Sequence, residues 1–260
     1  MIGGPANVTR LRWRWSRFAR LACFACALWS GVSAAESYLI LSLLGDRLTT
    51  VVEGAPAGGA ADGNRYEVGR MTGTALEDFV VHAADAAIQR AAHAASVTML
   101  RAADPKLYAS SDGWFDVTPD QIHALVAFVT QAVPPAPDAR LLLIAPYLAQ
   151  PQLRTATDYR GTGSVAGLGF YVSDQLVPGQ GSAGYLGVFA NFQLLLINLR
   201  TEAVERREII VTGTAYSAAR APDGFAANAL SREEKIKALQ AIVQDEIARV
   251  VPAMVGSVKR

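Results

Sequence analysis

The sequence predicts a single α/β domain, in which helices flank a mixed, mostly antiparallel sheet that ends in a long β-hairpin and a C-terminal helix. Three observations predict this class. Three helix-capping boxes each precede an apolar stripe of helical period, strand-like apolar runs lie between and around them, and two such runs close the sheet ahead of the third helix. Of the 260 residues, we expect 36–260 to form one domain.

The three predicted helices begin at capping boxes. In each box a Thr or Ser is followed three positions later by Glu or Gln, so two otherwise unpaired backbone N–H groups gain acceptors. The boxes pair Thr74 with Glu77, Thr118 with Gln121, and Ser231 with Glu234. They predict helices near residues 74–94, 119–133 and 232–250.

Strands are expected in the apolar runs between these helices. YLILSLL and RLTTVVE, joined at Gly45–Asp46, are typical of a β-hairpin. Further strands are expected at 96–101, 140–147 and 167–173. The segment between the second run and the first helix is rich in glycine and alanine, which predicts a flexible loop at 53–65.

Residues 189–213 supply the last two strands. The first, at 189–199, is apolar on both faces, as expected for a strand covered on both sides. We expect a turn near 201–203, with Leu194, Leu196 and Ile209 facing packed helices. The charged residues between them would project into water and carry little folding energy, so that Glu205, Arg206 and Arg207 could form a contact turn.

The sequence FQLLLINLRTEAVERREIIV, followed by the helix REEKIKALQAIVQDEIARVV, resembles small α/β domains of bacterial envelope proteins. Examples are the amino-terminal domain of the Tol-system protein TolB and the periplasmic domain of the curli secretion protein CsgG. The resemblance is one of element order over about half of the domain. It implies a periplasmic α/β fold and assigns no site residue.

The first 35 residues are typical of a secretory signal peptide. Five arginines and no acidic residue precede an apolar run at 21–32, and small residues follow it. We expect cleavage after Ala34 or Ala35, because the apolar run is shorter than the roughly 20 residues that span a bilayer. The alternatives are a retained amino-terminal anchor and a lipid attached to a cysteine.

Removing this segment changes the chemistry of the chain. Cys23 and Cys26 are lost, which leaves no thiol for disulfides, metals or catalysis. Of 24 basic residues 19 remain against 23 acidic ones, a net charge of −4. We therefore expect no binding to nucleic acid, which requires phosphate neutralisation, and no membrane span in the mature chain.

Three short motifs have enzymatic or nucleotide-binding counterparts, but their contexts argue against those functions. In GDRL, Arg47 stands where related esterases have a serine nucleophile, and no histidine follows His123. GTGSVAG lies between two expected strands, not between a strand and a helix. In GQGSAG, Gln180 replaces the first glycine of a nucleophile elbow.

The histidines give no strong metal site. The predicted bounds place His82 and His93 on the first helix, and Asp78 and Asp85 flank His82 at helical spacing. This is the face opposite the apolar stripe, where solvated polar residues are expected. We therefore predict no metal and no cofactor.

The remaining candidates are long loops at 150–164 and 173–187, which border the 167–173 strand. Asp158, Tyr159 and Arg160 form their densest polar and aromatic cluster, a possible recognition loop. We expect a periplasmic or secreted, non-enzymatic protein that contacts an envelope protein. The alternative is a periplasmic hydrolase that uses carboxylates paired by the fold.

Overall fold

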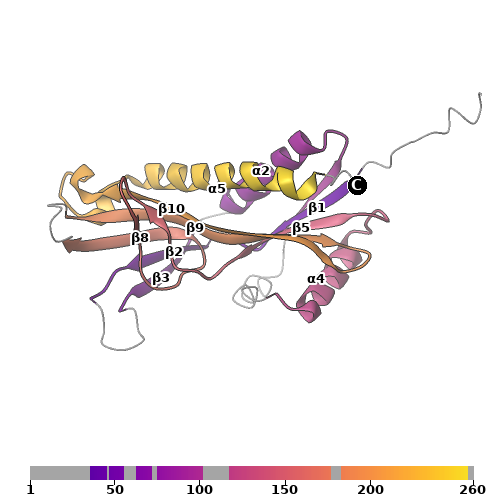
Figure 1. The fold of residues 1–260 in the computed structure, drawn as a ribbon, viewed down its shortest axis with the longest axis horizontal. Helices are drawn as coiled ribbons and strands as arrows, with labels where there is room; N and C mark the ends of the chain where they lie inside the picture. The colour runs from indigo at the N-terminus through magenta and orange to yellow at the C-terminus, as the bar shows by residue number, and fades with distance from the viewer. Residues whose placement is uncertain are drawn as a thin grey trace, which may run out of the picture. The chain divides into compact units, whose positions relative to one another are not determined.

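The computed structural model describes residues 36–45, 47–55, 63–71, 75–101, 117–176 and 183–256. They belong to one compact unit, Glu36–Arg260, which is an α/β domain with a mixed ten-stranded sheet (Figure 1). The strands are β1 (Ser37–Ser42), β2 (Arg47–Val52), β3 (Arg65–Arg70), β4 (Ser96–Leu100), β5 (Arg140–Pro146), β6 (Leu153–Arg154), β7 (Tyr159–Arg160), β8 (Gly167–Leu176), β9 (Ala183–Asn198) and β10 (Val204–Ser217). The helices are α2 (Ala75–Ala91), α4 (Pro119–Ala132) and α5 (Arg232–Val255), with 3-10 turns η2 (Ala218–Arg220) and η3 (Ala226–Asn228).

The 16-residue strand β9 organises the sheet. Along one side it pairs antiparallel with β10, which confirms the predicted closing hairpin. Along its other side the first half pairs with β8 and the second half with β5. Beyond β5 lie β1 and β4, beyond β8 lie β2 and β3, and beyond β10 lie the short strands β6 and β7.

The predicted hairpin between β1 and β2 is wrong. β1 lies parallel to β5 and β2 lies parallel to β8, and both of those strands are antiparallel to β9. β1 and β2 therefore run in the same direction, and Gly45, with φ of 61°, stands at a break between them. The apolar strand β1 is buried between two neighbouring strands, β4 and β5. In a hairpin, the half-exposed strand β2 would have taken the place of one of them.

The loop predicted at 53–65 lies partly outside the described residues, which omit 56–62. Its end is occupied by the start of β3, a strand that the sequence did not indicate. All six residues of β3 are exposed, so the strand lacks the apolar alternation that marks a half-buried strand. It forms by pairing with β2 at the edge of the sheet.

Two of the predicted capping boxes are present. The Thr118 hydroxyl accepts from the Gln121 N–H at 3.3 Å, and the Ser231 hydroxyl accepts from the Glu234 N–H at the same distance. Thr74 lies outside the described residues. α5 continues past its predicted end at residue 250, because Met254 and Val255 are buried. His93 lies beyond the end of α2 and not on it.

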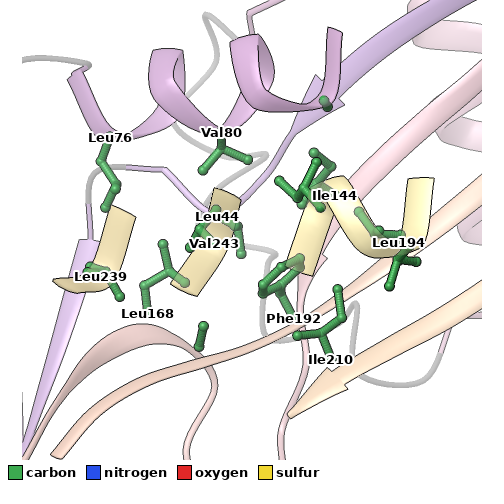
Figure 2. Close-up of a cluster of buried hydrophobic side chains, with 14 of the residues drawn as sticks. Leu44, Leu76, Val80, Ile144, Leu168, Phe192, Leu194, Ile210, Leu239 and Val243 are labelled. Carbon is green, nitrogen blue, oxygen red and sulfur yellow. The ribbon is translucent and has the colours of Figure 1, made fainter. Parts of the chain in front are cut away.

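Helices cover both faces of the sheet, as the two-sided apolar pattern of β9 predicts. α2 and α5 lie on one face and α4 lies on the other (Figure 1). The side chains of Phe192 and Leu194 point to the face of α2 and α5, as does Leu196, whereas Leu195 and Ile197 point to α4. Figure 2 shows the buried side chains between the sheet and the helices α2 and α5, with Leu76 and Val80 of α2 above the sheet residues.

Ile209 was expected in the core, but it is 45% exposed. It pairs with Gln193 on the face of α4, near the edge of the sheet, where α4 does not reach. Its neighbour Ile210 pairs with Phe192 and is buried on the face of α5. Successive side chains of a strand point to opposite faces of the sheet, so Ile209 is exposed while Ile210 is buried.

None of the described helices has the length and apolar character needed to cross a membrane.

Candidate partner-binding edge along β10

The charged residues near the hairpin lie in β10 itself and contact the domain. The turn occupies residues 199–201, slightly before its predicted position. Glu205 accepts hydrogen bonds from Arg140 Nε at 2.7 Å and Asn198 Nδ2 at 2.9 Å. Partial burial works against ionisation of Glu205, but these two donors lower the pKa of its carboxyl. Glu205 is therefore fixed on the sheet.

The two arginines are also engaged. Arg206 donates to the carbonyl of Ala253 near the end of α5. On the opposite face, Arg207 Nε donates to Oε1 of the buried Gln193 at 2.9 Å, and its guanidinium lies 5.9 Å from the centre of the Tyr147 ring. Arg206 and Arg207 therefore lie on the strand β10, where their side chains contact the domain, and not in a solvated turn as we expected.

His123, near the start of α4, lies beside this hairpin. Its Nδ1 atom is 2.7 Å from Glu202 Oε2, and Glu202 adopts a positive φ of 58° at the turn. The hydrogen bond to Glu202 raises the pKa of His123 above its usual value. A raised pKa in the folded state favours charged histidine, so the pair stabilises the fold at pH values below the ordinary pKa. That contribution disappears as the pH rises through the raised pKa.

We expect Glu202→Gln to lower the pKa of His123 toward about 6.5, the value of an unperturbed histidine. The titration of the His123 ring C–H signals by NMR measures this directly. Asp120 also raises the pKa of His123, but by a smaller effect, so Asp120→Asn is the matched control and should lower it less. A pKa that is insensitive to Glu202→Gln would contradict the pairing.

Most of the outer edge of β10 is joined by no strand of the described residues. Among the described strands, only β6 joins this edge, and it does so at Gly213 and Thr214 alone. Residues 204–212 therefore have no neighbouring strand on that side within the described part of the chain. Val204 and Ile209 are 40% and 45% exposed on this stretch. An unpaired strand edge offers a row of backbone N–H and C=O groups to another strand.

An excursion of the chain between β5 and β8 brings β6 and β7 to this edge. Its base is closed by two backbone hydrogen bonds between Ala149 and Val165, at 3.0 and 2.9 Å. Asn191 Nδ2 donates to the carbonyls of both residues at 3.1 Å. This fully buried asparagine fixes the excursion to β9. In the sequence, this contact is indicated by a polar residue, Asn191, within an otherwise apolar strand.

Leu153 anchors the other end of the excursion. It is fully buried, and it lies against two glycines, Gly187 of β9 and Gly213 of β10. A Cβ atom on Gly187 would lie 2.5 Å from Leu153 Cδ1, so the absence of a side chain there lets β6 approach the sheet closely. β6 and β7 are thus held on the sheet by packing as well as by two residue pairs.

The structure separates the three residues of the predicted recognition loop. Asp158 accepts from the backbone N–H of Tyr159 at 2.7 Å and so shapes the turn before β7. Arg160 pairs with the buried Leu153, while Tyr159 pairs with Arg154 and is 63% exposed. Because paired residues share a face of the sheet, Tyr159 and Arg154 point together, away from Leu153 and Arg160.

Tyr159 and Arg154 form one wall of a groove of about 270 Å³. Thr212 and Thr214 of β10 line its floor, and α5 supplies the opposite wall, which carries Ile242, Asp245 and Glu246. The groove directly continues the unpaired edge of β10. The structure therefore places the two stretches predicted for recognition, around residues 159 and 206, along one strand edge.

A second pocket, of about 250 Å³, lies between α2 and the end of β4. It contains the buried Glu77, together with Asp78 and the exposed His82. Asp78 forms an ion pair with Arg101. No group of three or more His, Cys, Asp or Glu side chains within the described ranges is arranged to hold a metal ion.

Comparison with known proteins adds no relative: no protein-family model matches the chain, and no curated protein sequence matches it.

Proposed function

We propose that this protein is exported and acts in the bacterial cell envelope by binding a protein partner along the β10 edge. The observation that carries the proposal is the outer edge of residues 204–212, which no described strand joins although β9 pairs with their inner edge, directly beside the groove with exposed Tyr159. A peptide that adds a strand to a sheet gains backbone hydrogen bonds, and adjacent pockets select its side chains. The β10 edge supplies the backbone groups, and the groove beside it supplies a pocket for a side chain.

The chemistry of the edge supports a protein partner. Tyrosine and arginine are enriched among the residues that dominate binding energies, and Tyr159 and Arg154 stand together at the groove. Ile209 adds an exposed apolar side chain, and Glu208, on the face of α5, adds an exposed charge. Arg206 and Arg207 hold β10 in place through their contacts with Ala253 and Gln193.

A periplasmic hydrolase is the second candidate, and the pocket with Glu77 and Asp78 is the observation that favours it. Its two carboxyl groups, Glu77 and Asp78, are consecutive in sequence, and Asp78 forms an ion pair with Arg101. A hydrolase of this kind needs two carboxyl groups that flank the substrate bond, whereas consecutive residues of a helix point about 100° apart. The β10 edge therefore supports the proposed function better.

Site-specific photo-cross-linking in cells tests the proposal. A photoreactive amino acid at position 159 or 209 should give the same discrete adduct with one envelope protein. Phe225 and Phe128 are matched controls, because they are 63% and 44% exposed, as Tyr159 and Ile209 are 63% and 45% exposed. The mass spectrum of the adduct should also show an amino terminus at Ala35 or Glu36.

A charge reversal then separates binding from folding. Glu208→Lys should reduce the adduct at position 159 while the melting temperature stays unchanged, because exposed substitutions alter stability by no more than about 0.5 kcal/mol. Adducts of equal yield at all four positions, or none at 159 and 209, would argue against a partner at this edge.

A further inference from the structure

A separate pocket lies at the other end of the domain face that carries α5. It is formed by β2, β3 and β8 together with the first turn of α5, and its volume is about 220 Å³. Two cationic residues of α5 line it, Arg232 and Lys235, and no acidic residue of the described ranges does. Arg70 of β3 reaches its rim, but Arg70 pairs with Arg47, so its side chain belongs to the opposite face of the sheet. Glu67, the acidic residue of β3, pairs with Thr50 and so lies on the same face of the sheet as the pocket, where it forms an ion pair with Arg65 at 3.0 Å.

Lys235 is the most constrained of these cations. Its Nζ atom donates to the carbonyl of Ala227 at 2.7 Å and lies 5.9 Å from the centre of the Phe170 ring. An ammonium group has three donors, so donors remain for a ligand. Burial lowers the pKa of Lys235 below its usual value, and an anion close to Nζ would compensate for that loss of solvation.

The rest of the pocket is apolar. Leu48, Met71, Phe170 and Ile236 contribute half-buried side chains to its wall. Gly69 keeps the pocket open, because a Cβ atom at this position would have only the carbonyl oxygen of Leu48 within 4 Å, at 3.9 Å. A side chain at position 69 would therefore project into the pocket without a clash with the backbone.

We propose that this pocket binds a small organic anion, a carboxylate or phosphate group attached to a short apolar chain. Arg232 and Lys235 supply the positive charge for the charged group, and a guanidinium group matches both kinds of oxyanion with paired hydrogen bonds. The apolar wall takes the chain. A volume of about 220 Å³ is below the roughly 300–1,000 Å³ of sites for drug-sized ligands, so the ligand is small or only its charged end enters.

Methyl NMR of the purified protein tests this site. Titration with hexanoate or with hexyl phosphate should shift the methyl signals of Ile236 and Met71 in a saturable way. The stronger of the two identifies the charged group as carboxylate or phosphate. Acetate, which lacks the chain, and 1-hexanol, which lacks the charge, should each bind at least about tenfold more weakly, because one lost charged hydrogen bond or buried apolar chain costs 1.4 kcal/mol or more.

Three variants assign the binding to this pocket. Lys235→Gln should raise the Kd about tenfold, the loss expected for one hydrogen bond to a charged group. Gly69→Val should abolish the shifts by filling the pocket, and Lys237→Gln, on the same helix but outside the lining, should leave the Kd within about twofold. The remaining methyl signals report whether each variant is folded. Binding of 1-hexanol as tight as that of the anions, or a Kd unchanged by both Lys235→Gln and Gly69→Val, would overturn the proposal.

Discussion

Replacing Ile210 with alanine is expected to lower the free energy of unfolding by about 2–5 kcal/mol, the usual cost of truncating a buried isoleucine. The same replacement at Ile209 should change it by no more than about 0.5 kcal/mol, as at most exposed sites. The two residues are neighbours on β10 and have identical side chains. They therefore form a matched pair in which burial is the main difference.

The reason lies in the two faces of the strand. Ile210 is 2% exposed and belongs to the cluster that joins α2 and α5 to the sheet, beside Phe192 (Figure 2). Ile209 points to the other face and is 45% exposed at the unpaired edge. Truncating Ile210 leaves a cavity between sheet and helix, whereas truncating Ile209 removes atoms that already contact water.

Denaturation by urea, followed by circular dichroism, gives both values. Comparable losses in the two variants would mean that Ile209 is packed, as the sequence suggested, and that the β10 edge is covered. A negligible loss at Ile210 would mean that α5 does not hold the sheet as described. If the expected difference is found, Ile209 variants can be used in binding experiments without concern about unfolding.

The helices were predictable because their signals are local. The capping boxes at Thr118 and Ser231 and the apolar stripes that follow them fix α4 and α5 within a few residues of sequence. The strands were predictable from apolar runs for the same reason. The pairing of β1 with β4 and β5, and of β2 with β8, was not, since it depends on contacts between residues that lie far apart in the chain.

The candidate site shows the same division. Tyr159 stood out in the sequence as an aromatic residue in a polar loop, and the structure places it at the groove. Its position beside β10 depends on the fully buried Leu153 and Asn191, which act at a distance in sequence. A strand of two residues such as β6 has too few side chains for a periodic pattern. Its location was therefore not predictable from the chain alone.

Replacing Gly169 with alanine is expected to destabilise the domain by about 3 kcal/mol or more, above the typical range for overpacking, because the added atom would collide with backbone. Gly169 lies in β8, where a Cβ atom would stand 1.9 Å from the carbonyl oxygen of Thr49 in β2 and 2.9 Å from the Phe189 ring. The backbone of β2 cannot give way as a flexible side chain can, so β2 and β8 would have to separate.

Gly69→Ala is the control for this prediction. Gly69 is also a strand glycine, but the nearest atom to its added Cβ would be 3.9 Å away. Its replacement should change the free energy of unfolding by no more than about 1 kcal/mol, in either direction. Urea denaturation of the two variants decides the matter. Equal stabilities would mean that β2 does not lie against β8, and the hairpin of β2 with β1 that the sequence predicts would be the better placement. A large loss of stability in the Gly169 variant alone supports the parallel pairing of β2 with β8.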